Sequence, residues 1–188
     1  LSQRTQTYTR PKLNTIEVWN RARANGNEPG GYSRFRITDN GVSPVAIPGE
    51  SSHTYVATGL EHTEGGAPSY NPQVHRQMTA KRFRKVELLK REKGWIRRFD
   101  NGLPAEIGLL GWGSTEGAAR EAARLAFARG LGVSVLYPVL LYPLPEEEMK
   151  ELLSPLKQVI VLESNYTGQL ARLMRAELGL VSIRLSIS

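Results

Sequence analysis

The chain has 188 residues, enough for one sizeable domain with an extended segment. Hydrophobic residues make up 40% of the sequence and charged residues 23%, as in ordinary globular proteins. It has no cysteine, which excludes disulfides, iron–sulfur ligation and thiolate chemistry from this chain and fits a cytoplasmic protein. No apolar run approaches the roughly 20 residues that span a bilayer. Pro138 and Pro143 interrupt the most apolar stretch, 131–144, so we expect no membrane partner.

The net charge of +7 is unevenly distributed along the chain. Residues 1–103 carry 17 Lys and Arg against 9 Asp and Glu, a net charge of +8, whereas residues 104–188 carry 8 against 9, a net charge of −1. A basic surface attracts nucleic acid, phosphorylated cofactors or an acidic protein, and charge alone does not choose among them. The chain begins at Leu1 without a methionine or a signal pattern, so we expect it to be a piece of a longer polypeptide.

The first seventy or so residues predict an extended, loop-rich segment. Glycine, proline and asparagine cluster at 26–31, 40–49 and 65–68, which leaves only 32–37 and 54–57 as short strand candidates. A loop-rich stretch of this length is unusual as a free-standing unit, so we expect it to wrap over a larger body.

A densely basic helix is predicted over about 71–93. Asn71 and Pro72 supply a cap and a first-turn proline, and Gly94 ends the helix. Phe83, Trp95 and Phe99 accompany its Lys and Arg residues, a mixture that also occurs in nucleic-acid-binding proteins. No helix-turn-helix, zinc-finger or RNA-recognition motif accompanies it, so we predict a solvated or docking face and no nucleic-acid partner.

From Pro104 the sequence alternates between strands and helices. We expect strands over 106–112, 133–136, 158–163 and 181–187, and helices over 115–129, 145–153 and 168–177. Apolar strands alternating with helices predict a parallel sheet covered on both faces. The predicted fold class is therefore α/β, a three-layer, open and mostly parallel sheet over 104–188, preceded by the loop-rich basic segment 1–103.

Two polar loops follow strands of this predicted sheet. The first contains Gly113, Ser114 and Thr115, where helix amides and hydroxyl groups suit an anion. It departs from the dinucleotide fingerprint, because the glycine spacing 111–117 is one residue too long and no acidic residue ends the second strand. The competing interpretation is that Ser114 or Thr115 caps the helix and Gly117 lets it pack closely on the sheet.

The second polar loop contains Asn165, Thr167, Gly168 and Gln169. Ligands of open α/β sheets bind at the carboxyl edge of the strands, so two polar loops there predict a ligand site or a subunit contact. We favour helix capping combined with a contact over catalysis.

A third group of polar residues spans 58–82. Glu61 beside His62 suggests an acid/base pair, and His62 with His75 suggests a metal. The two histidines are 13 residues apart, wider than the spacing of one helical turn that metal ligands commonly show, so we predict no metal site. A loop held by polar contacts is the default interpretation. The candidate cofactor-site or interface residues are Thr58, Gly59, Glu61, His62, His75, Lys81 and Arg82.

An ordered set of motifs resembles the alpha subunits of 2-oxoacid:ferredoxin oxidoreductases, most of all the 2-oxoglutarate type. The motifs are Thr58-Gly59-Leu60-Glu61-His62, Gly111-Trp112-Gly113-Ser114-Thr115, Pro143-Leu144-Pro145 and the stretch from Glu163 to Leu170. Each motif alone is weak, but their order over residues 50–188 is fairly specific. Glu163-Ser164-Asn165 stands where the family usually has Glu-Asn or Glu-Leu-Asn.

The resemblance implies oxidative decarboxylation of a 2-oxoacid to acyl-CoA, carbon dioxide and reduced ferredoxin, with thiamine diphosphate and coenzyme A. It implies that residues 1–103 hold the end of a pyrimidine-binding domain plus a linker helix, and that 104–188 resemble the transketolase carboxy-terminal domain. The family's Gly-Asp-Gly…Asn motif and iron–sulfur cysteines, both absent here, belong to the beta subunit. We therefore expect no catalytic residue and no cofactor bound by this chain alone, and place thiamine diphosphate, Mg²⁺ and an iron–sulfur cluster in the beta subunit or the complex. The expected partners are the beta subunit, ferredoxin and coenzyme A.

A second interpretation remains open. The chain could be a non-catalytic α/β ligand-binding or regulatory module whose basic segment docks an acidic partner. Neither the preferred 2-oxoacid nor the partner that 58–85 contacts (cofactor, ferredoxin or only protein) follows from the sequence.

Overall fold

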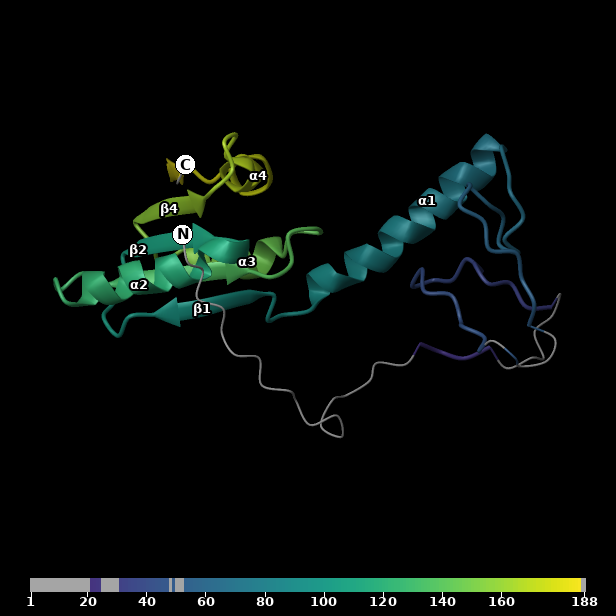
Figure 1. Cartoon of the computed structure of the whole chain (residues 1–188), viewed down its shortest axis with the longest axis horizontal. Coiled ribbons are helices and arrows are strands. Elements are labelled where there is room, and N and C mark those ends of the chain that lie inside the picture. The colour runs from purple at the N-terminus through teal and green to yellow at the C-terminus, as the bar shows by residue number, and fades with distance from the viewer. Residues whose placement is uncertain (1–20, 25–30, 48, 50–52, 187–188) are drawn as a thin grey trace, which may run out of the picture. The chain divides into compact units, whose positions relative to one another are not determined.

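The computed structural model describes residues 21–24, 31–47, 49 and 53–186 of the chain. The chain divides into two compact units between Arg82 and Phe83 (Figure 1).

Irregular chain makes up most of the first unit. Two isolated bridges, between Arg23 and Val45 and between His62 and Pro68, are its β-type pairings among the described residues. The strands expected over 32–37 and 54–57 do not form, and 34–35 lies in a turn. The physical reason is that backbone groups of this segment make their hydrogen bonds within turns or to side chains, and not to a neighbouring strand. For example, the Ile37 amide donates to the Glu64 carboxylate at 2.7 Å.

The predicted basic helix is confirmed as α1 (Pro72–Glu87), followed by the short 3-10 helix η2 (Leu88–Arg91). The Asn71 side chain accepts a hydrogen bond from the Gln73 amide at 2.8 Å, as a cap should. Gly94 takes a positive φ of 90°, which glycine adopts more readily than other residues.

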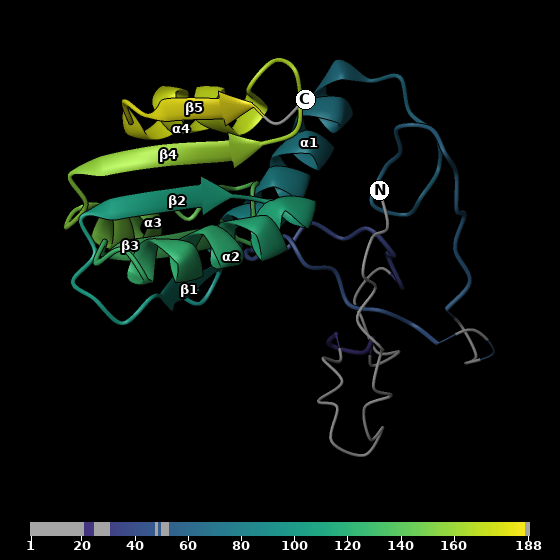
Figure 2. The same ribbon diagram turned by 60° about the vertical axis from the view of Figure 1, so that its left-hand side comes forward.

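The second unit contains the sheet and its helices. The sheet has five strands in the order β1-β3-β2-β4-β5; β1 is antiparallel to β3, and the other neighbours are parallel (Figure 2). The elements are β1 (Ile96–Asp100), β2 (Ile107–Gly111), η3 (Gly113–Thr115), α2 (Glu116–Phe127), β3 (Val133–Pro138), α3 (Glu146–Leu153), β4 (Gln158–Glu163), α4 (Gln169–Leu178) and β5 (Ile183–Ser186).

Two apolar cores lie on opposite faces of this sheet. Successive residues of a strand point to opposite faces, so Leu109 and Leu110 of β2 belong to different cores. The core with Leu110 includes Met149 of α3 and Met174 of α4, both fully buried. The core with Leu109 includes residues of α2, and Figure 2 shows α2 on the opposite side of the sheet from α3 and α4. The predicted three-layer, mostly parallel α/β fold is therefore confirmed.

Strand β1 was not predicted from the sequence, and it precedes Pro104, where the α/β domain was expected to begin. The second compact unit begins at Phe83, and β1 pairs with β3 over its whole length, from Ile96 to Asp100. Only Ile96 of this strand is buried. An edge strand with charged side chains lacks the apolar pattern that identifies the central strands.

Candidate functional site

Three of the candidate residues in the first unit form one polar cluster. The Glu61 carboxylate lies 2.6 Å from Nδ1 of His75 and accepts hydrogen bonds from Arg82 at 2.7 and 3.2 Å. The Arg82 hydrogen bonds are the largest cause that lowers the pKa of Glu61 to about 2, although partial burial acts in the opposite direction. Glu61 therefore remains ionised throughout the neutral range and ties its loop to α1.

The suggestion that the side chains of Glu61 and His62 form an acid/base pair is wrong. Glu61 meets the ring of His75, and only the backbone amide of His62 donates to Glu61, at 3.3 Å. Nδ1 of His62 lies 3.0 Å from the Thr63 carbonyl, and its ring lies 3.9 Å from that of Phe35. The two histidines thus contact different partners, as expected of a loop held by polar contacts.

The remaining candidates of this group have local roles. The Thr58 hydroxyl accepts from the Leu60 amide at 3.1 Å, and Gly59 is exposed. Lys81 is 8% exposed, and its ammonium donates to the Phe35 carbonyl at 2.6 Å and to the Ser43 hydroxyl. A buried ammonium requires such partners, so Lys81 holds the loop 35–43 against α1.

The end of the basic segment pairs with acidic residues of its own chain. Nζ of Lys90 lies 3.8 Å from the Glu146 carboxylate, and Nζ of Lys93 lies 3.2 Å from that of Glu151. The Glu148 carboxylate accepts hydrogen bonds at 3.1 Å from the amides of residues 94 and 95. Helix α3 therefore offsets part of the positive charge of the basic segment.

In the glycine-containing loop after β2, Thr115 stands at the start of α2 but its side chain makes no cap hydrogen bond. Its hydroxyl donates to the Trp112 carbonyl and hydrogen-bonds the Tyr137 hydroxyl. Burial raises the pKa of the Tyr137 phenol, and the Thr115 hydrogen bond opposes this rise. Gly113, with φ of 62°, and Ser114 complete the short turn η3.

The close packing expected at Gly117 is not observed there, and the crowded glycine is Gly111. A Cβ atom added to Gly117 would meet no other atom within 4 Å, whereas one added to Gly111 would lie 2.6 Å from the Tyr137 hydroxyl. The position that requires glycine is therefore the last residue of β2, where the backbone passes directly over the Tyr137 side chain.

The polar loop after β4 caps α4, as expected. Glu163 is fully buried, and its carboxylate accepts from the Asn165 side chain at 2.6 Å and from the Leu170 and Ala171 amides at 2.9 and 3.3 Å. Asn165 in turn accepts from the Gln169 amide at 3.0 Å, and from the Thr167 hydroxyl at 3.5 Å. Gly168 takes the left-handed conformation that starts the helix. These donors and acceptors serve the helix terminus.

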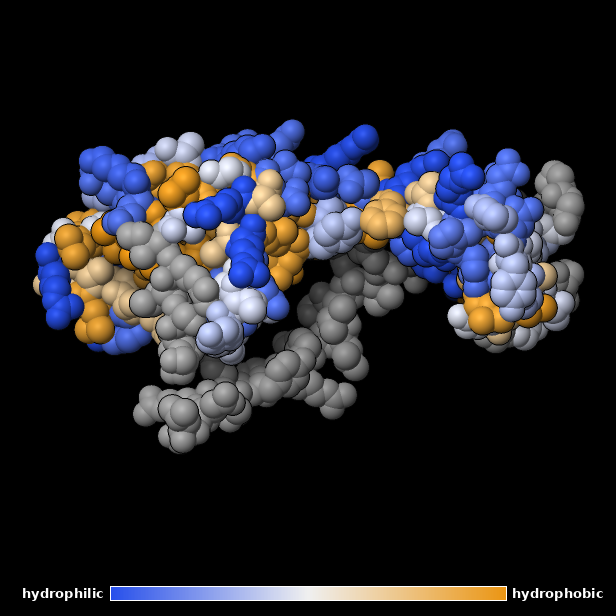
Figure 3. Space-filling view, turned by 90° about the horizontal axis from the view of Figure 1, so that it is seen from above, coloured by the Kyte–Doolittle hydropathy of each residue, from blue (hydrophilic) through white to orange (hydrophobic). Residues whose placement is uncertain are grey.

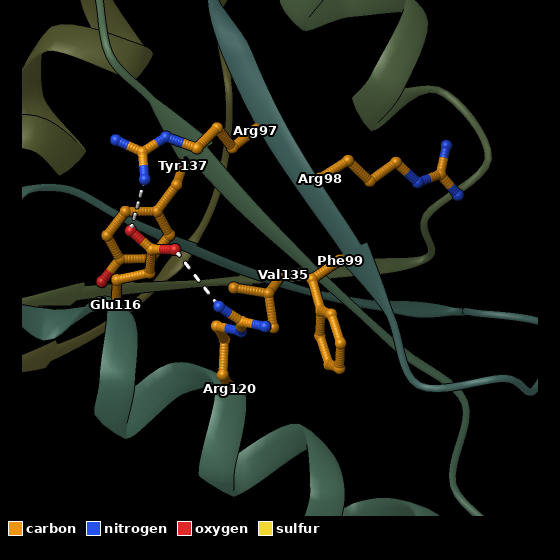
Figure 4. Close-up of a pocket in the computed structure, with 7 residues that line it drawn as sticks. All are labelled: Arg97, Arg98, Phe99, Glu116, Arg120, Val135 and Tyr137. Carbon is orange, nitrogen blue, oxygen red and sulfur yellow. Dashed lines mark hydrogen bonds and ion pairs between the residues drawn. The ribbon is translucent and has the colours of Figure 1, made fainter. Parts of the chain in front are cut away.

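A groove between β1 and α2 was not predicted from the sequence (Figure 4). It is a cavity of about 310 Å³. Arg97 of β1 lies 3.1 Å from the Glu116 carboxylate, and Arg120 of α2 lies 3.8 Å from it. The Arg120 guanidinium also lies over the ring of Phe99, 4.9 Å from its centre. We call this cavity the β1–α2 groove; its lining residues are Arg97, Arg98, Phe99, Glu116, Arg120, Val135 and Tyr137.

A neighbouring cavity of about 320 Å³ shares Arg97, Glu116 and Tyr137 with the β1–α2 groove and extends it past Trp112 and Val139. The groove therefore runs to the carboxyl ends of β2 and β3, the edge where open α/β sheets commonly bind ligands. Two sequence signals could have indicated it: the alternation of positions 97 and 99 on one face of a strand, and the helical spacing of positions 116 and 120. Both become informative only once β1 is recognised.

Across the helices of the described residues, none has the length and apolar character needed to cross a membrane.

Comparisons with known proteins agree on one enzyme class. Residues 105–185 match the family model described as pyruvate:ferredoxin oxidoreductase core domain II. The 2-oxoglutarate:ferredoxin oxidoreductase of Magnetococcus marinus, solved with 2-oxoglutarate, coenzyme A and succinyl-CoA bound, is 38% identical with a TM-score of 0.80. That match covers 95% of this chain and 31% of the other.

Curated relatives give the same result. Subunit alpha of 2-oxoacid:ferredoxin oxidoreductase 2 from Aeropyrum pernix is 34% identical over 80% of this chain and 23% of its own length. The 2-oxoglutarate oxidoreductase subunit KorA of Mycobacterium tuberculosis is 32% identical over 82% of this chain and 26% of its own length. The chain thus spans about a quarter of the length of these relatives.

Proposed function

Because the chain belongs to the family of 2-oxoacid:ferredoxin oxidoreductase alpha subunits, we propose that it forms the carboxy-terminal part of such a subunit. The whole enzyme would convert a 2-oxoacid to acyl-CoA, carbon dioxide and reduced ferredoxin. The observation that carries the proposal is the match to the Magnetococcus marinus enzyme, which extends over 95% of the chain and includes the first unit as well as the sheet.

The thiamine chemistry itself is assigned to other parts of the enzyme. The chain has no cysteine to ligate an iron–sulfur cluster. Its sequence also lacks the Gly-Asp-Gly…Asn motif that the resemblance places in the beta subunit. We therefore derive no reaction step from this chain. The proposed role of the chain is assembly and the shaping of one wall of the active site.

We propose 2-oxoglutarate as the first substrate to test. The relative with the solved structure carries this oxoacid together with coenzyme A, and the Mycobacterium tuberculosis relative is named for it. The proposed partners are a beta subunit, ferredoxin and coenzyme A, and the proposed location is the cytoplasm.

The segment 58–82 is proposed to contact either the active site or a neighbouring subunit. Its support is the cluster around Glu61, which fixes the loop while leaving the side chains of His75 and Arg82 66% and 49% exposed. A fixed loop with exposed polar side chains can present them to another surface at low entropic cost. Thr58, Gly59 and His62 belong to the same loop.

The alternative of a non-catalytic module with a basic docking segment has less support. Lys90 and Lys93 already pair with carboxylates of α3, so part of the basic segment serves its own domain. An acidic partner would have to compete with these contacts.

The experiment is to co-express the full alpha subunit with its beta subunit and to measure viologen reduction that depends on a 2-oxoacid and coenzyme A. The controls are the beta subunit alone and this chain alone, both expected to be inactive. Comparison of 2-oxoglutarate with pyruvate identifies the substrate. A purified complex that reduces no viologen with any oxoacid would refute the proposed function.

A further inference from the structure

We propose that the β1–α2 groove is the docking site for an acidic segment of the beta subunit, an inference that rests on the proposed function. The groove is formed within the second unit alone, by strands β1 and β3 and helix α2, and it is open to solvent. Nothing in the sequence motifs of the chain accounts for it.

The charge in the groove favours a carboxylate. Arg97 and Arg120 share the single carboxylate of Glu116, which leaves one positive charge in excess (Figure 4). Their side chains are 65% and 54% exposed, and each guanidinium has five N–H donors, most of which Glu116 does not use. The third arginine, Arg98, points away and pairs with Asp100 at 2.9 Å.

The groove holds the two guanidinium groups in place. Arg120 lies over the ring of Phe99, while Val135 and Tyr137 of β3, both buried, form the floor. Arginines restrained in this way lose little side-chain entropy when their N–H groups bind a carboxylate. They therefore suit an interface better than unrestrained surface arginines do.

Exposed apolar side chains continue the groove at one end. Trp112 is 36% exposed and Val139 is 49% exposed, and both line its extension. In the same unit, Tyr142 is 63% exposed and contacts the ring of Phe83. Hydrophobic side chains are visible among the charged ones on the surface of this unit (Figure 3). Tryptophan, tyrosine and arginine are the residues that contribute most to protein interfaces.

The expected strengths of the contacts favour a protein segment over a small anion. An exposed ion pair changes a binding equilibrium by a factor of about five or less, too little to retain a small carboxylate at useful concentration. A peptide that places a carboxylate on Arg97 and Arg120 and an apolar side chain on Trp112 combines both contributions. The relatives are named as subunits, so a partner polypeptide is available to supply that segment.

The test uses the full alpha subunit and its beta subunit. The dissociation constant of the complex is measured by sedimentation, at low and high salt, for wild type and for the double variant Arg97→Ala, Arg120→Ala. We expect the double variant to bind at least about tenfold more weakly and to lose much of the salt dependence. Trp112→Ala should weaken the complex by a similar factor.

The matched control is the double variant Arg172→Ala, Arg175→Ala, which removes two exposed arginines from α4 of the same unit. It should bind the beta subunit within about threefold of wild type. If the groove variant fails to fold by circular dichroism, Arg120→Gln, which keeps an uncharged polar side chain beside Glu116, replaces it. Wild-type affinity of the groove variants, or equal weakening by the control, overturns the inference.

The viologen assay separates this inference from the proposed function. An active wild-type complex whose affinity the groove variants leave unchanged overturns the docking site and leaves the function standing. Absence of any complex between wild-type subunits overturns both. Loss of alpha–alpha association without loss of beta binding would identify a second copy of this chain as the occupant, which also overturns the inference.

Discussion

The buried carboxylate of Glu163 provides the sharpest test of how the second unit is held together. It is fully buried at the end of β4 and accepts hydrogen bonds from the Asn165 side chain and from the first amides of α4. Three donors converge on its two oxygens, so Glu163→Gln must place an NH₂ group against at least one N–H donor. The variant also removes a negative charge from the helix amino terminus.

The expected cost follows from these contacts. A hydrogen bond to a charged group contributes about 1.5–3 kcal/mol, and a charge at a helix end about 0.3–1 kcal/mol. The amide oxygen of the introduced glutamine can still accept some of the three hydrogen bonds. Glu163→Gln should therefore destabilise the protein by roughly 2–4 kcal/mol. Glu163→Ala leaves all three donors without their acceptor and opens a cavity, so its cost should exceed that of Glu163→Gln.

The assay is urea denaturation of the full chain by circular dichroism, together with hydrogen exchange of the Leu170 and Ala171 amides. The matched control is Glu177→Gln, the same change at an exposed position near the other end of α4. It should change stability by less than about 0.5 kcal/mol. The reasoning is refuted if Glu163→Gln is as stable as this control, or if the two amides exchange no faster.

Three further outcomes are expected. Gly111→Ala forces a methyl group against the Tyr137 hydroxyl and should cost about 1–3 kcal/mol in urea denaturation, whereas Gly117→Ala, in open space within α2, should stabilise by about 0.5–1 kcal/mol. The pKa of Glu61 is lowered on folding from 4.5 to about 2, so its stabilising contribution is complete above pH 4.5 and is lost as the pH falls towards 2. The protection of amides over 61–82, relative to their intrinsic exchange rates at each pH, should therefore fall in that window in wild type and less in Glu61→Gln. Lys81→Ala should expose the loop 35–43 to proteolysis, while Lys85→Ala, at an exposed position of the same helix, should not; equal cleavage of both variants would count against the anchoring role.

The local signals of the sequence were sufficient for the central part of the fold. β4 was predicted with its observed bounds, 158–163, and β2 and β3 to within a few residues, because buried parallel strands are continuous apolar runs. The helix expected over 115–129 is also present, as α2 (Glu116–Phe127). The edge strand β1 carries no such run and was missed.

For the polar residues, the sequence identified the loops and not the pairings. Asn165 was expected at a helix start and lies there, but the buried acceptor for the α4 amides is Glu163, the last residue of a strand. Similarly, Glu61 was paired with its neighbour His62, whereas the structure pairs it with His75. Contacts between residues 14 positions apart depend on the path of the chain between them, which residue types do not specify.

The sequence by itself determined the α/β class, the central strands and the family resemblance, since each depends on apolar periodicity or on motifs of a few adjacent residues. Only the tertiary structure decided where the positive charge is used. It pairs Lys90 and Lys93 with α3, buries Lys81 under a loop and brings Arg97 and Arg120 together across the β1–α2 groove. Electrostatic interactions depend on distance in space and on burial, and both are properties of the folded chain rather than of residue order.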